Sequence, residues 1–335
     1  VILIRNVLYD TGVFKSVSFE IPVICVGNLV VGGSGKTPFT EYLIGLLGNR
    51  KIAVLSRGYG RKTTGFILAD QNANAETIGD EPMQFYTKFP QVTVAVCESR
   101  VKGIKMLQAS HDLIILDDAF QHRAVKPGFS ILLFEYQKLL RPQFLLPAGN
   151  LREPFRAYKR ADLLLLTKAP QFLDNKQMQT CINKFKELTN AEPIISFLEY
   201  GKLTSLNQRH RQPAPQLSAI THIFLLTGIA NPKPLLSHLE QYSLNIHHHE
   251  YADHYNFRTR DVEKLVNAFQ EHPSKDKLII TTEKDVQRLN NAALKELLLN
   301  LPVFYLPVKI ALGDKDKAIF DQKILDYVSG TTRNR

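Results

Sequence analysis

Cysteine is scarce in this chain of 335 residues, which has only three. Cys25, Cys97 and Cys181 are too widely spaced for a CxxC metal site, and two lie in apolar runs, so we expect reduced thiols of a cytosolic protein. No run of about 18 apolar residues occurs, so we expect no segment that spans a bilayer. Repeats of fixed period are also lacking, which argues against a repeat architecture.

Acidic residues are outnumbered, with 32 Asp and Glu against 42 Lys and Arg, which gives a formal net charge of +10. This excess suggests an anionic partner such as nucleic acid, a phosphorylated substrate or an acidic membrane surface, and charge alone does not choose among them. The apolar residues 1–19 carry Arg5 and Lys15, and they either lie on a membrane surface or pack as a helix on their own domain. Because the first residue is Val1 and not Met, we expect that a segment precedes it.

Short apolar runs alternate with amphipathic stretches over the first half of the chain. The runs are rich in β-branched residues and leucine and are bounded by Gly, Pro or a charge, which is typical of strands buried on both faces. This alternation predicts an α/β fold in which helices cover both sides of a parallel sheet. We expect strands at residues 21–28, 51–58, 92–99, 113–118, 129–135 and 161–168, and helices at residues 36–48 and 99–110.

A length of 335 residues exceeds what one hydrophobic core usually supports, and the apolar pattern loosens near residue 195. We interpret the basic, proline-containing residues 195–217 as a linker between a core domain at residues 1–194 and a smaller α/β domain at residues 218–335. In the smaller domain we expect strands at residues 222–229, 245–254, 277–285 and 303–312 and helices at residues 232–242, 258–271 and 317–329.

The stretch VGNLVVGGSGKTP at residues 26–38 nearly matches the phosphate-binding pattern GxxxxGK[ST], but Val30 replaces its first glycine. A predicted strand precedes it and a predicted helix follows, so backbone N–H groups and the helix N-terminus would converge on phosphate oxygens. We expect Lys36 to reach the outer phosphates and Thr37 to bind Mg²⁺, while Pro38 removes one N–H donor. A plain glycine-rich turn is the alternative. The predicted nucleotide-binding residues are Val31, Gly32, Gly33, Ser34, Gly35, Lys36, Thr37 and Pro38.

A second signal is LIILDD at residues 113–118, where a predicted strand ends in Asp117 and Asp118. Ligands of open α/β sheets collect at the carboxyl ends of the strands. We therefore expect Asp117 to bind Mg²⁺, directly or through water, and Asp118 to orient the acceptor or the metal shell. Two solvated carboxylates at the start of a loop are the alternative.

Three further polar clusters stand near the ends of predicted elements. Arg57 and Arg61 lie on a glycine-containing loop suited to an anionic substrate group. Asp80 precedes a helical stretch, where it could equally be an N-terminal cap. Arg152 and Glu153 suggest a phosphate clamp beside an orienting carboxylate. Taken singly, each cluster is also compatible with ordinary surface structure.

Three consecutive histidines, His247, His248 and His249, alternate along a predicted strand and cannot all face one metal ion. We therefore favour an edge strand over a metal site. His254 stands beside Asp253 where that run ends, a position from which an imidazole can relay a proton.

Taken together and in order, these motifs resemble the tetraacyldisaccharide 4′-kinase family of lipid A biosynthesis. The match runs over nearly the whole chain as RNVLYD, VGNLVVGGSGKTP, LSRGYGRK, GDEP, LDDAFQH, PAGNLREP, LLTGIANP, DHYNF and TEKD. The family loop itself lacks the first glycine and carries the proline. Asn150 is a departure, because many members of the family are expected to have proline there.

The resemblance implies ATP-dependent transfer of the γ-phosphate to the 4′-hydroxyl of a tetraacyldisaccharide 1-phosphate, with ATP and Mg²⁺ as cofactors. It implies a peripheral or monotopic protein at the anionic cytoplasmic face of the inner membrane, and we expect no nucleic-acid partner. It also implies a P-loop NTPase-like α/β/α sandwich joined by a β-strand linker to a second, smaller α/β/α domain, with the site in the cleft between them. We make no prediction of protein partners.

Site roles follow from the same resemblance. Because His254 belongs to the second domain, the cleft must close around the reacting groups, and we expect slow ATP hydrolysis without lipid. The implied roles are phosphate and Mg²⁺ binding for Lys36, Thr37 and Asp117, acid/base catalysis for Asp80 with His254, charge stabilisation for Arg152 and Glu153, a place beside these groups for Asp118, and weaker substrate binding for Arg57, Arg61 and His122.

Two other functions are compatible with the phosphate loop. A nucleotide-driven switch or metal-delivery protein accounts for the loop, the aspartates and the histidines, but it leaves GDEP, LREP and the N-terminus unexplained. Such a switch usually carries an NKxD motif that recognises guanine, and TEKD at residues 282–285 matches this motif only weakly. A soluble small-molecule kinase on the same scaffold is the other alternative, and the apolar N-terminus argues against it.

Overall fold

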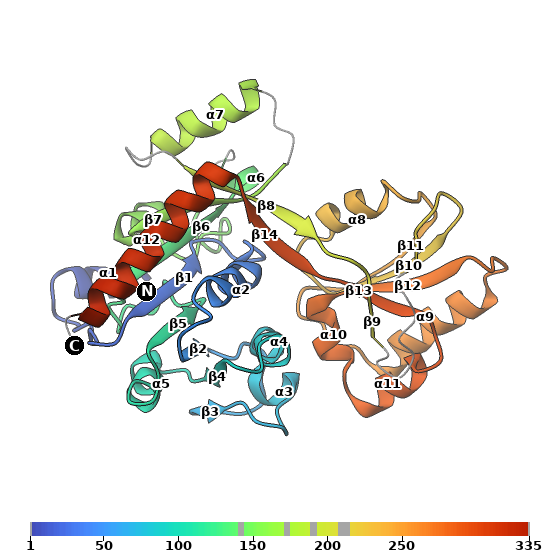
Figure 1. Ribbon diagram of the computed structural model, residues 1–335, viewed down its shortest axis with the longest axis horizontal. Coiled ribbons are helices and arrows are strands. Elements are labelled where there is room, and N and C mark those ends of the chain that lie inside the picture. The colour runs from blue at the N-terminus through green and yellow to red at the C-terminus, as the bar shows by residue number, and fades with distance from the viewer. Residues whose placement is uncertain (1, 140–143, 171–174, 188–192, 207–214, 334–335) are drawn as a thin grey trace.

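Two β-sheets organise the chain, and the computed structural model describes residues 2–139, 144–170, 175–187, 193–206 and 215–333 (Figure 1). In spatial order, the nine strands of the larger sheet are β14 (Val308–Leu312), β8 (Ile194–Tyr200), β7 (Leu163–Ala169), β6 (Phe129–Glu135), β1 (Val23–Asn28), β5 (Leu113–Asp117), β2 (Ile52–Ser56), β4 (Thr93–Val96) and β3 (Ile67–Leu68). Neighbouring strands run parallel except at the two edges, where β14 lies antiparallel to β8 and β3 lies antiparallel to β4. The predicted α/β class is confirmed.

Helices cover both faces of the larger sheet. Apolar residues of α5 and α7 pack into a core on one face, and those of α2 and α12 pack into a separate core on the other. The helical segments around this sheet are α1 (Ile2–Asp10), α2 (Lys36–Leu46), α3 (Ala75–Ile78), α4 (Asp80–Lys88), α5 (Arg100–Leu107), α6 (Tyr136–Leu139), the 3₁₀ helix η1 (Phe155–Arg160), α7 (Asn175–Lys186) and α12 (Asp314–Arg333).

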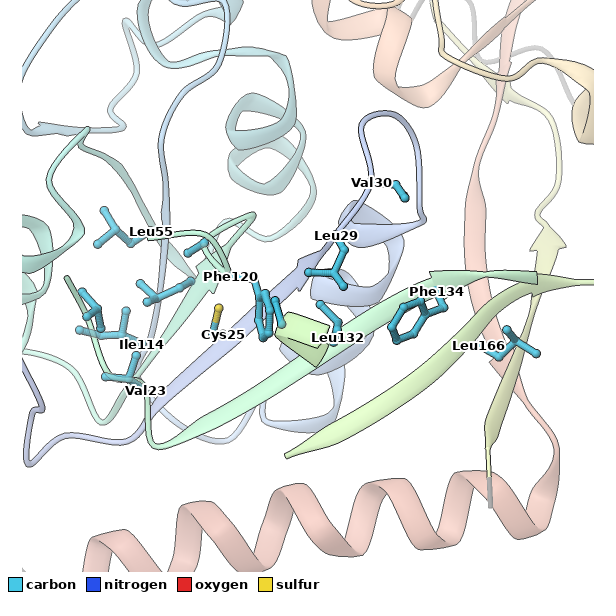
Figure 2. Close-up of a cluster of buried hydrophobic side chains, with 14 of the residues drawn as sticks. Val23, Cys25, Leu29, Val30, Leu55, Ile114, Phe120, Leu132, Phe134 and Leu166 are labelled. Atoms are coloured by element: carbon cyan, nitrogen blue, oxygen red, sulfur yellow. The ribbon is translucent and has the colours of Figure 1, made fainter. Parts of the chain in front are cut away.

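Strand β1 shows why the sequence predicts these elements well. Val23 and Cys25 point into one core and Ile24 and Val26 into the other, because successive side chains leave opposite faces of a strand. Figure 2 shows Val23 and Cys25 within the first of these cores. A strand covered on both faces has no polar side, so its residues form a continuous apolar run. Burial raises the pKa of Cys25 to about 12, so its thiol stays neutral.

The smaller sheet has five strands, which in spatial order are β11 (Ile246–Glu250), β10 (His222–Thr227), β12 (Lys277–Thr282), β13 (Val303–Leu306) and β9 (Thr204–Ser205). The first four run parallel, and β9 pairs antiparallel with β13. Helices α8 (Lys233–Leu239), α9 (Thr259–Glu271), α10 (Glu283–Leu289) and α11 (Ala292–Leu298) accompany this sheet. Two buried apolar clusters fill its faces.

The expected boundaries at residues 195–217 and 218–335 need correction. Strand β8, placed in the linker by the sequence, belongs to the larger sheet, and residues 207–214 of that linker lie outside the described residues. The chain also returns, because β14 pairs with β8 and α12 buries Phe320 and Ile324 in the core of the larger domain. The run at residues 303–312 is therefore two strands in two sheets. They are separated by Pro307, which has no N–H to continue a ladder.

Helix α1 has two different sides. Asn6 is buried against the larger domain, whereas Leu3, Ile4 and Val7 each expose about half or more of their surface. In the described part of the chain, no helix combines the length and apolar character needed to cross a membrane. The helix thus packs on its own domain through one side and leaves an apolar side uncovered by the described residues.

Candidate active site

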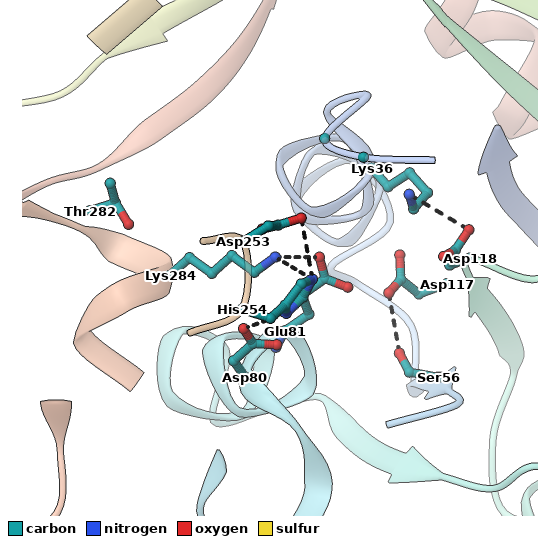
Figure 3. A network of polar contacts seen from close by, with 12 residues as sticks. Lys36, Ser56, Asp80, Glu81, Asp117, Asp118, Asp253, His254, Thr282 and Lys284 are labelled. Carbon is teal, nitrogen blue, oxygen red and sulfur yellow. Dashed lines mark hydrogen bonds and ion pairs between the residues drawn. The ribbon is translucent and has the colours of Figure 1, made fainter. Parts of the chain in front are cut away.

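A cavity of about 850 Å³ lies between the carboxyl ends of the central strands of the larger sheet and the smaller domain. The phosphate loop, the ends of β2 and β5 and the start of α4 line one side, and residues after β10, β11 and β12 line the other. Figure 3 shows side chains from both domains directed toward this space. The sequence-predicted residues that line it are Val31, Gly32, Gly33, Ser34, Gly35, Lys36, Thr37, Pro38, Arg57, Asp80, Asp117, Asp118, His122, Arg152 and His254.

The phosphate loop connects β1 to α2 and is held by its own side chains. Gly32 and Gly35 have φ of 92° and 84°, a left-handed conformation that favours glycine. Asn28 at the end of β1 donates from Nδ2 to Oγ of Ser34 at 2.6 Å, which fixes the depth of the loop. Helix α2 begins at Lys36, so its first N–H groups face the cavity.

Val30 occupies the position of the missing glycine for a structural reason. Its side chain is 7% exposed and packs in the core, and its backbone forms an antiparallel bridge with Leu151. The next residue, Val31, donates its N–H to the carbonyl of Asn150 at 2.8 Å. The chain is therefore still extended at this point and needs no left-handed residue until Gly32.

Lys168 is a site residue that the sequence reading missed. It lies near the end of β7 with a φ of 55°, and its ammonium donates to the carbonyl of Gly33 in the phosphate loop. Next to it, Thr167 donates from Oγ1 to the carbonyl of Ser34 at 2.8 Å. The sequence could have indicated both residues, because Thr167 and Lys168 stand near the carboxyl end of a parallel strand and such ends meet at one edge of the sheet.

The paired aspartates at the end of β5 have opposite electrostatic environments. Asp117 is 1% exposed and accepts hydrogen bonds only from the hydroxyls of Thr40 and Ser56, both at 3.3 Å, within the described residues. Burial, together with the charges of Glu81 and Asp118, raises its pKa to about 7.

Asp118 adopts a φ of 47° and contacts two cations, Lys36 at 3.6 Å and Arg152 at 2.9 Å. Burial by itself would raise its pKa, but Lys36 and Arg152 more than offset this and lower the pKa below its usual value.

The surroundings of Asp117 fit a divalent cation. The pKa of this fully buried carboxylate stays raised although the charge of Lys36 lowers it, so its negative charge is only partly compensated. A hard cation with oxygen ligands would supply the remaining positive charge. Thr37, in the first turn of α2, lines the same cavity and adds a hydroxyl, as does Ser56 at the end of β2. Asp117 and Thr37, the two ligands predicted from the sequence, are thus compatible with Mg²⁺.

A second polar group joins the two domains. His254, which has a φ of 58°, places Nδ1 2.9 Å from Oδ2 of Asp80 and Nε2 3.2 Å from Nζ of Lys284 (Figure 3). An ammonium can only donate, so Nε2 accepts and the proton of the neutral imidazole lies on Nδ1, which donates to Asp80. Burial by itself would raise the pKa of Asp80, but the hydrogen bond from His254 and the charges of Lys284 and Arg288 lower it to about 2.

Further ion pairs hold this arrangement together. Lys284 lies 3.1 Å from Glu81, and Lys88 lies 2.9 Å from Glu283, so α4 of the larger domain is bridged to α10 of the smaller one. Asp80 is the first residue of α4, whose N-cap is Gly79, so the capping alternative does not describe its position. The TEKD motif supplies Lys284 to this bridge.

Two predicted residues lie away from the cavity. Glu153 is fully buried, with ion pairs to Arg5 at 2.6 Å and to Arg160, and it is not among the described residues that line the cavity. Arg61 forms an ion pair with Glu98 and does not line the cavity either, in the described part of the chain.

Two arginines near the cavity, Arg5 and Arg100, were not predicted as site residues. Arg5 could not be found from sequence because it comes from α1, 148 positions from Glu153.

His122 lines the cavity near these cations. Its pKa is lowered to about 4 by burial and by the charges of Arg100 and Arg57, so its imidazole is neutral. Among the described residues, its Nε2 has no hydrogen-bond partner. A buried ring nitrogen without a partner is free to bind a ligand group that enters the cavity.

These features define a class of protein: an α/β kinase fold with a phosphate loop, a carboxylate pair at the end of the neighbouring strand and a cavity shared by two domains. A model of the Tetraacyldisaccharide-1-P 4′-kinase family matches residues 1–329. The chain belongs to this family.

Relatives of this family match over nearly the whole chain. The tetraacyldisaccharide 4′-kinase of Flavobacterium psychrophilum is 45% identical, over 99% of this chain and 94% of its own length. That of Bacteroides thetaiotaomicron is 42% identical, over 100% of this chain and 91% of its own. A crystal structure of LpxK from Aquifex aeolicus, described as the apo form in complex with ATP, shares 30% identity with a TM-score of 0.72, over 98% of this chain and 95% of that one.

Proposed function

We propose that the residues around this cavity catalyse transfer of the γ-phosphate of ATP to the 4′-hydroxyl of a tetraacyldisaccharide 1-phosphate, and that the proton of that hydroxyl passes to Asp80. Family membership carries the activity: the chain is an ATP-dependent tetraacyldisaccharide 4′-kinase of lipid A biosynthesis. The observation that supports the catalytic roles is the meeting of groups from two domains in one cavity.

The phosphate side of the reaction is positioned by the loop. Backbone N–H groups of residues 32–37 and the ammonium of Lys36 bind the phosphates, and Thr37 and Asp117 hold Mg²⁺. When bound, Mg²⁺ neutralises charge that develops on the phosphate oxygens. Asp118 is a positioning residue in this scheme, because it contacts both Lys36 and Arg152 and keeps the two cations at the edge of the cavity.

The acceptor side depends on Asp80 and His254. A carboxylate with a pKa of about 2 is a weak base, but phosphoryl transfer has a loose transition state and the hydroxyl proton becomes acidic only as the new bond forms. Late proton acceptance by Asp80 is therefore sufficient. His254 fixes the carboxylate through Nδ1, and it reaches Asp80 only when the smaller domain lies against α4.

The acidic groups of the substrate and the membrane would meet basic residues of this chain. Arg57 lines the cavity and is a candidate for an anionic substrate group, whereas Arg61 is occupied by Glu98. Helix α1 exposes Leu3, Ile4 and Val7 on one side and contributes Arg5 to the lining of the cavity. This arrangement supports a peripheral or monotopic position at the anionic cytoplasmic face of the inner membrane, with the substrate reached from the lipid surface.

The decisive assay combines γ-labelled ATP, Mg²⁺ and a tetraacyldisaccharide 1-phosphate acceptor. We expect label on the lipid, and only slow ATP hydrolysis without lipid. Asp80→Ala should lower turnover roughly a hundredfold to ten-thousandfold while ATP still binds. Asp70→Ala, at an exposed position, is the matched control and should leave turnover unchanged.

Each alternative outcome has a distinct meaning. Near-normal turnover of Asp80→Ala would remove this carboxylate from the proton-transfer role. Fast hydrolysis that does not depend on lipid would contradict the requirement for closure, and phosphorylation of a small soluble sugar in preference to the lipid would favour the soluble-kinase alternative.

A further inference from the structure

A group of three histidines lies in the smaller domain, apart from the cavity. His222 is the first residue of β10, His247 lies in β11, and His272 directly follows α9. Ile229 and Ala230, which follow the other end of β10, line the cavity. The intervening strand is about 17 Å long, so the three imidazoles are separate from the phosphate-binding machinery.

The nitrogen atoms of these rings are spaced as in a metal site. One ring nitrogen from each histidine lies within 4.8 Å of the other two. Nδ1 of His222 is 3.2 Å from Nε2 of His247. Tetrahedral Zn²⁺ with Zn–N distances of about 2.0–2.1 Å places its ligand nitrogens about 3.3–3.4 Å apart. The first pair therefore already has close to the required separation, and His272 has to move by no more than about 1.4 Å to complete one face of the tetrahedron.

Surrounding groups hold the rings in place. The ring of His247 stacks on Phe224, with centroids 4.6 Å apart, and the rings of His222 and His272 have centroids 4.2 Å apart. His247 sits opposite Phe224 in the parallel pairing of β10 with β11, so the ladder fixes its position. Nδ1 of His272 accepts from the N–H of Ser274 at 3.2 Å, which helps to orient this ring.

The consecutive histidines of β11 point alternately to the two faces of the sheet, as successive residues of a strand do. His248 points to the other face, where its Nε2 contacts Oγ1 of Thr227 at 2.8 Å. The prediction of an edge strand at this position is confirmed, since β11 ends the smaller sheet. The partners of His247 come from β10 and from the end of α9, so they could not be predicted from the three consecutive histidines alone.

An N–H···N hydrogen bond between His222 and His247 is the ordinary explanation of their contact. It accounts for two of the rings. The third ring is held by its contact with His222 and by the N–H of Ser274, and it also brings a nitrogen within 4.8 Å of the other two. We propose that His222, His247 and His272 bind one divalent transition-metal ion of the Zn²⁺ class through one nitrogen each. Three neutral imidazoles and no carboxylate suit Zn²⁺, Ni²⁺ or Cu²⁺ and not Mg²⁺, so this site and the active site would select different ions.

A bound ion would link three separate elements of the smaller domain. It would tie the edge strand β11 to β10 and to the end of α9, with the fourth position left to water. The expected consequence is a more stable smaller domain, because an ion that binds only the folded state shifts the unfolding equilibrium. Kinase activity should not require the ion, since none of the three histidines lines the cavity in the described part of the chain.

The test uses the full chain without a polyhistidine tag, stripped of metal by a chelator. Zn²⁺ is titrated in competition with a chromophoric chelator, and Co²⁺ is added separately for its absorption spectrum. We expect one equivalent of Zn²⁺ to bind in the presence of excess Mg²⁺ and to raise the melting temperature. His247→Ala and His272→Ala should each weaken Zn²⁺ binding by at least about tenfold and abolish that thermal shift.

His248→Ala is the matched control, because it removes an imidazole from the same strand but from the other face. It should leave Zn²⁺ affinity unchanged. His272→Ala should also keep its kinase activity and its circular dichroism spectrum, which keeps the test valid if His247→Ala folds poorly. The proposal is wrong if the unaltered chain binds no Zn²⁺ at micromolar concentration, or if His248→Ala weakens binding as much as His272→Ala does.

Discussion

Asp117→Asn should make the metal-free protein more stable while it abolishes catalysis. The carboxylate is fully buried, and its pKa is raised from 3.8 to about 7. In the unfolded chain this group loses its proton near pH 3.8, so between pH 4 and 7 the folded state binds one proton more than the unfolded state. The free energy of unfolding therefore falls as pH rises through this window, by about 1.4 kcal/mol per pH unit.

The size of the effect follows from the shift of about three pKa units. Above pH 7 the buried charge destabilises the wild-type protein by at most about 4 kcal/mol. Asparagine keeps the shape and a hydrogen-bonding group but carries no charge. The variant should thus exceed the wild type in stability at pH 8, and the difference should vanish near pH 4.

The assay is thermal unfolding from pH 4 to 8 with a chelator present. Because the chain has no tryptophan, circular dichroism is the suitable signal. Mg²⁺ should raise the melting temperature of the wild type and have little effect on the variant, and turnover of the variant should fall about a hundredfold or more. Asp118→Asn is the control with the opposite sign, since Lys36 and Arg152 make that charge stabilising. An Asp117→Asn variant with the pH slope of the wild type would refute the reasoning.

Three other predictions concern residues other than Asp117 and Asp118. Lys168→Met removes a charged donor to the carbonyl of Gly33, so ATP affinity should fall about tenfold in a nucleotide-binding titration. Unchanged affinity would show that this hydrogen bond does not support the phosphate loop. Gly103→Ala places a Cβ 2.6 Å from buried Leu55, so thermal unfolding should show a loss of about 1–3 kcal/mol, whereas Gly45→Ala in open space should gain about 0.5–1 kcal/mol. Glu153→Gln leaves the guanidinium groups of Arg5 and Arg160 poorly paired, so the free energy of unfolding should fall by about 1–3 kcal/mol and the KM for lipid should rise. An unchanged melting temperature would show that these ion pairs contribute little to stability.

Much of the catalytic site could be predicted because it belongs to short motifs at the ends of strands. The phosphate loop and the Asp117–Asp118 pair each follow a buried apolar run, and parallel strands bring such ends to one edge. Lys168 and Lys284 also stand at or just after the ends of parallel strands, so their place at such an edge was open to prediction, but their partners were not. Arg5 could not be found in this way, because it comes from α1 and reaches the site through a tertiary contact with a distant segment.

The sequence was enough to predict six strands of the larger sheet, the phosphate loop and the carboxylate proposed to bind Mg²⁺, because strand burial and backbone geometry are local properties. It did not determine where residues 303–312 belong, since an apolar run has the same appearance in either sheet. Only the tertiary structure placed β14 and α12 on the larger domain and brought His254 to Asp80. The same holds for the environment of Asp117 and for the meeting of three histidines. Burial and the distances between charges depend on the whole packed chain, not on the order of residues within a motif.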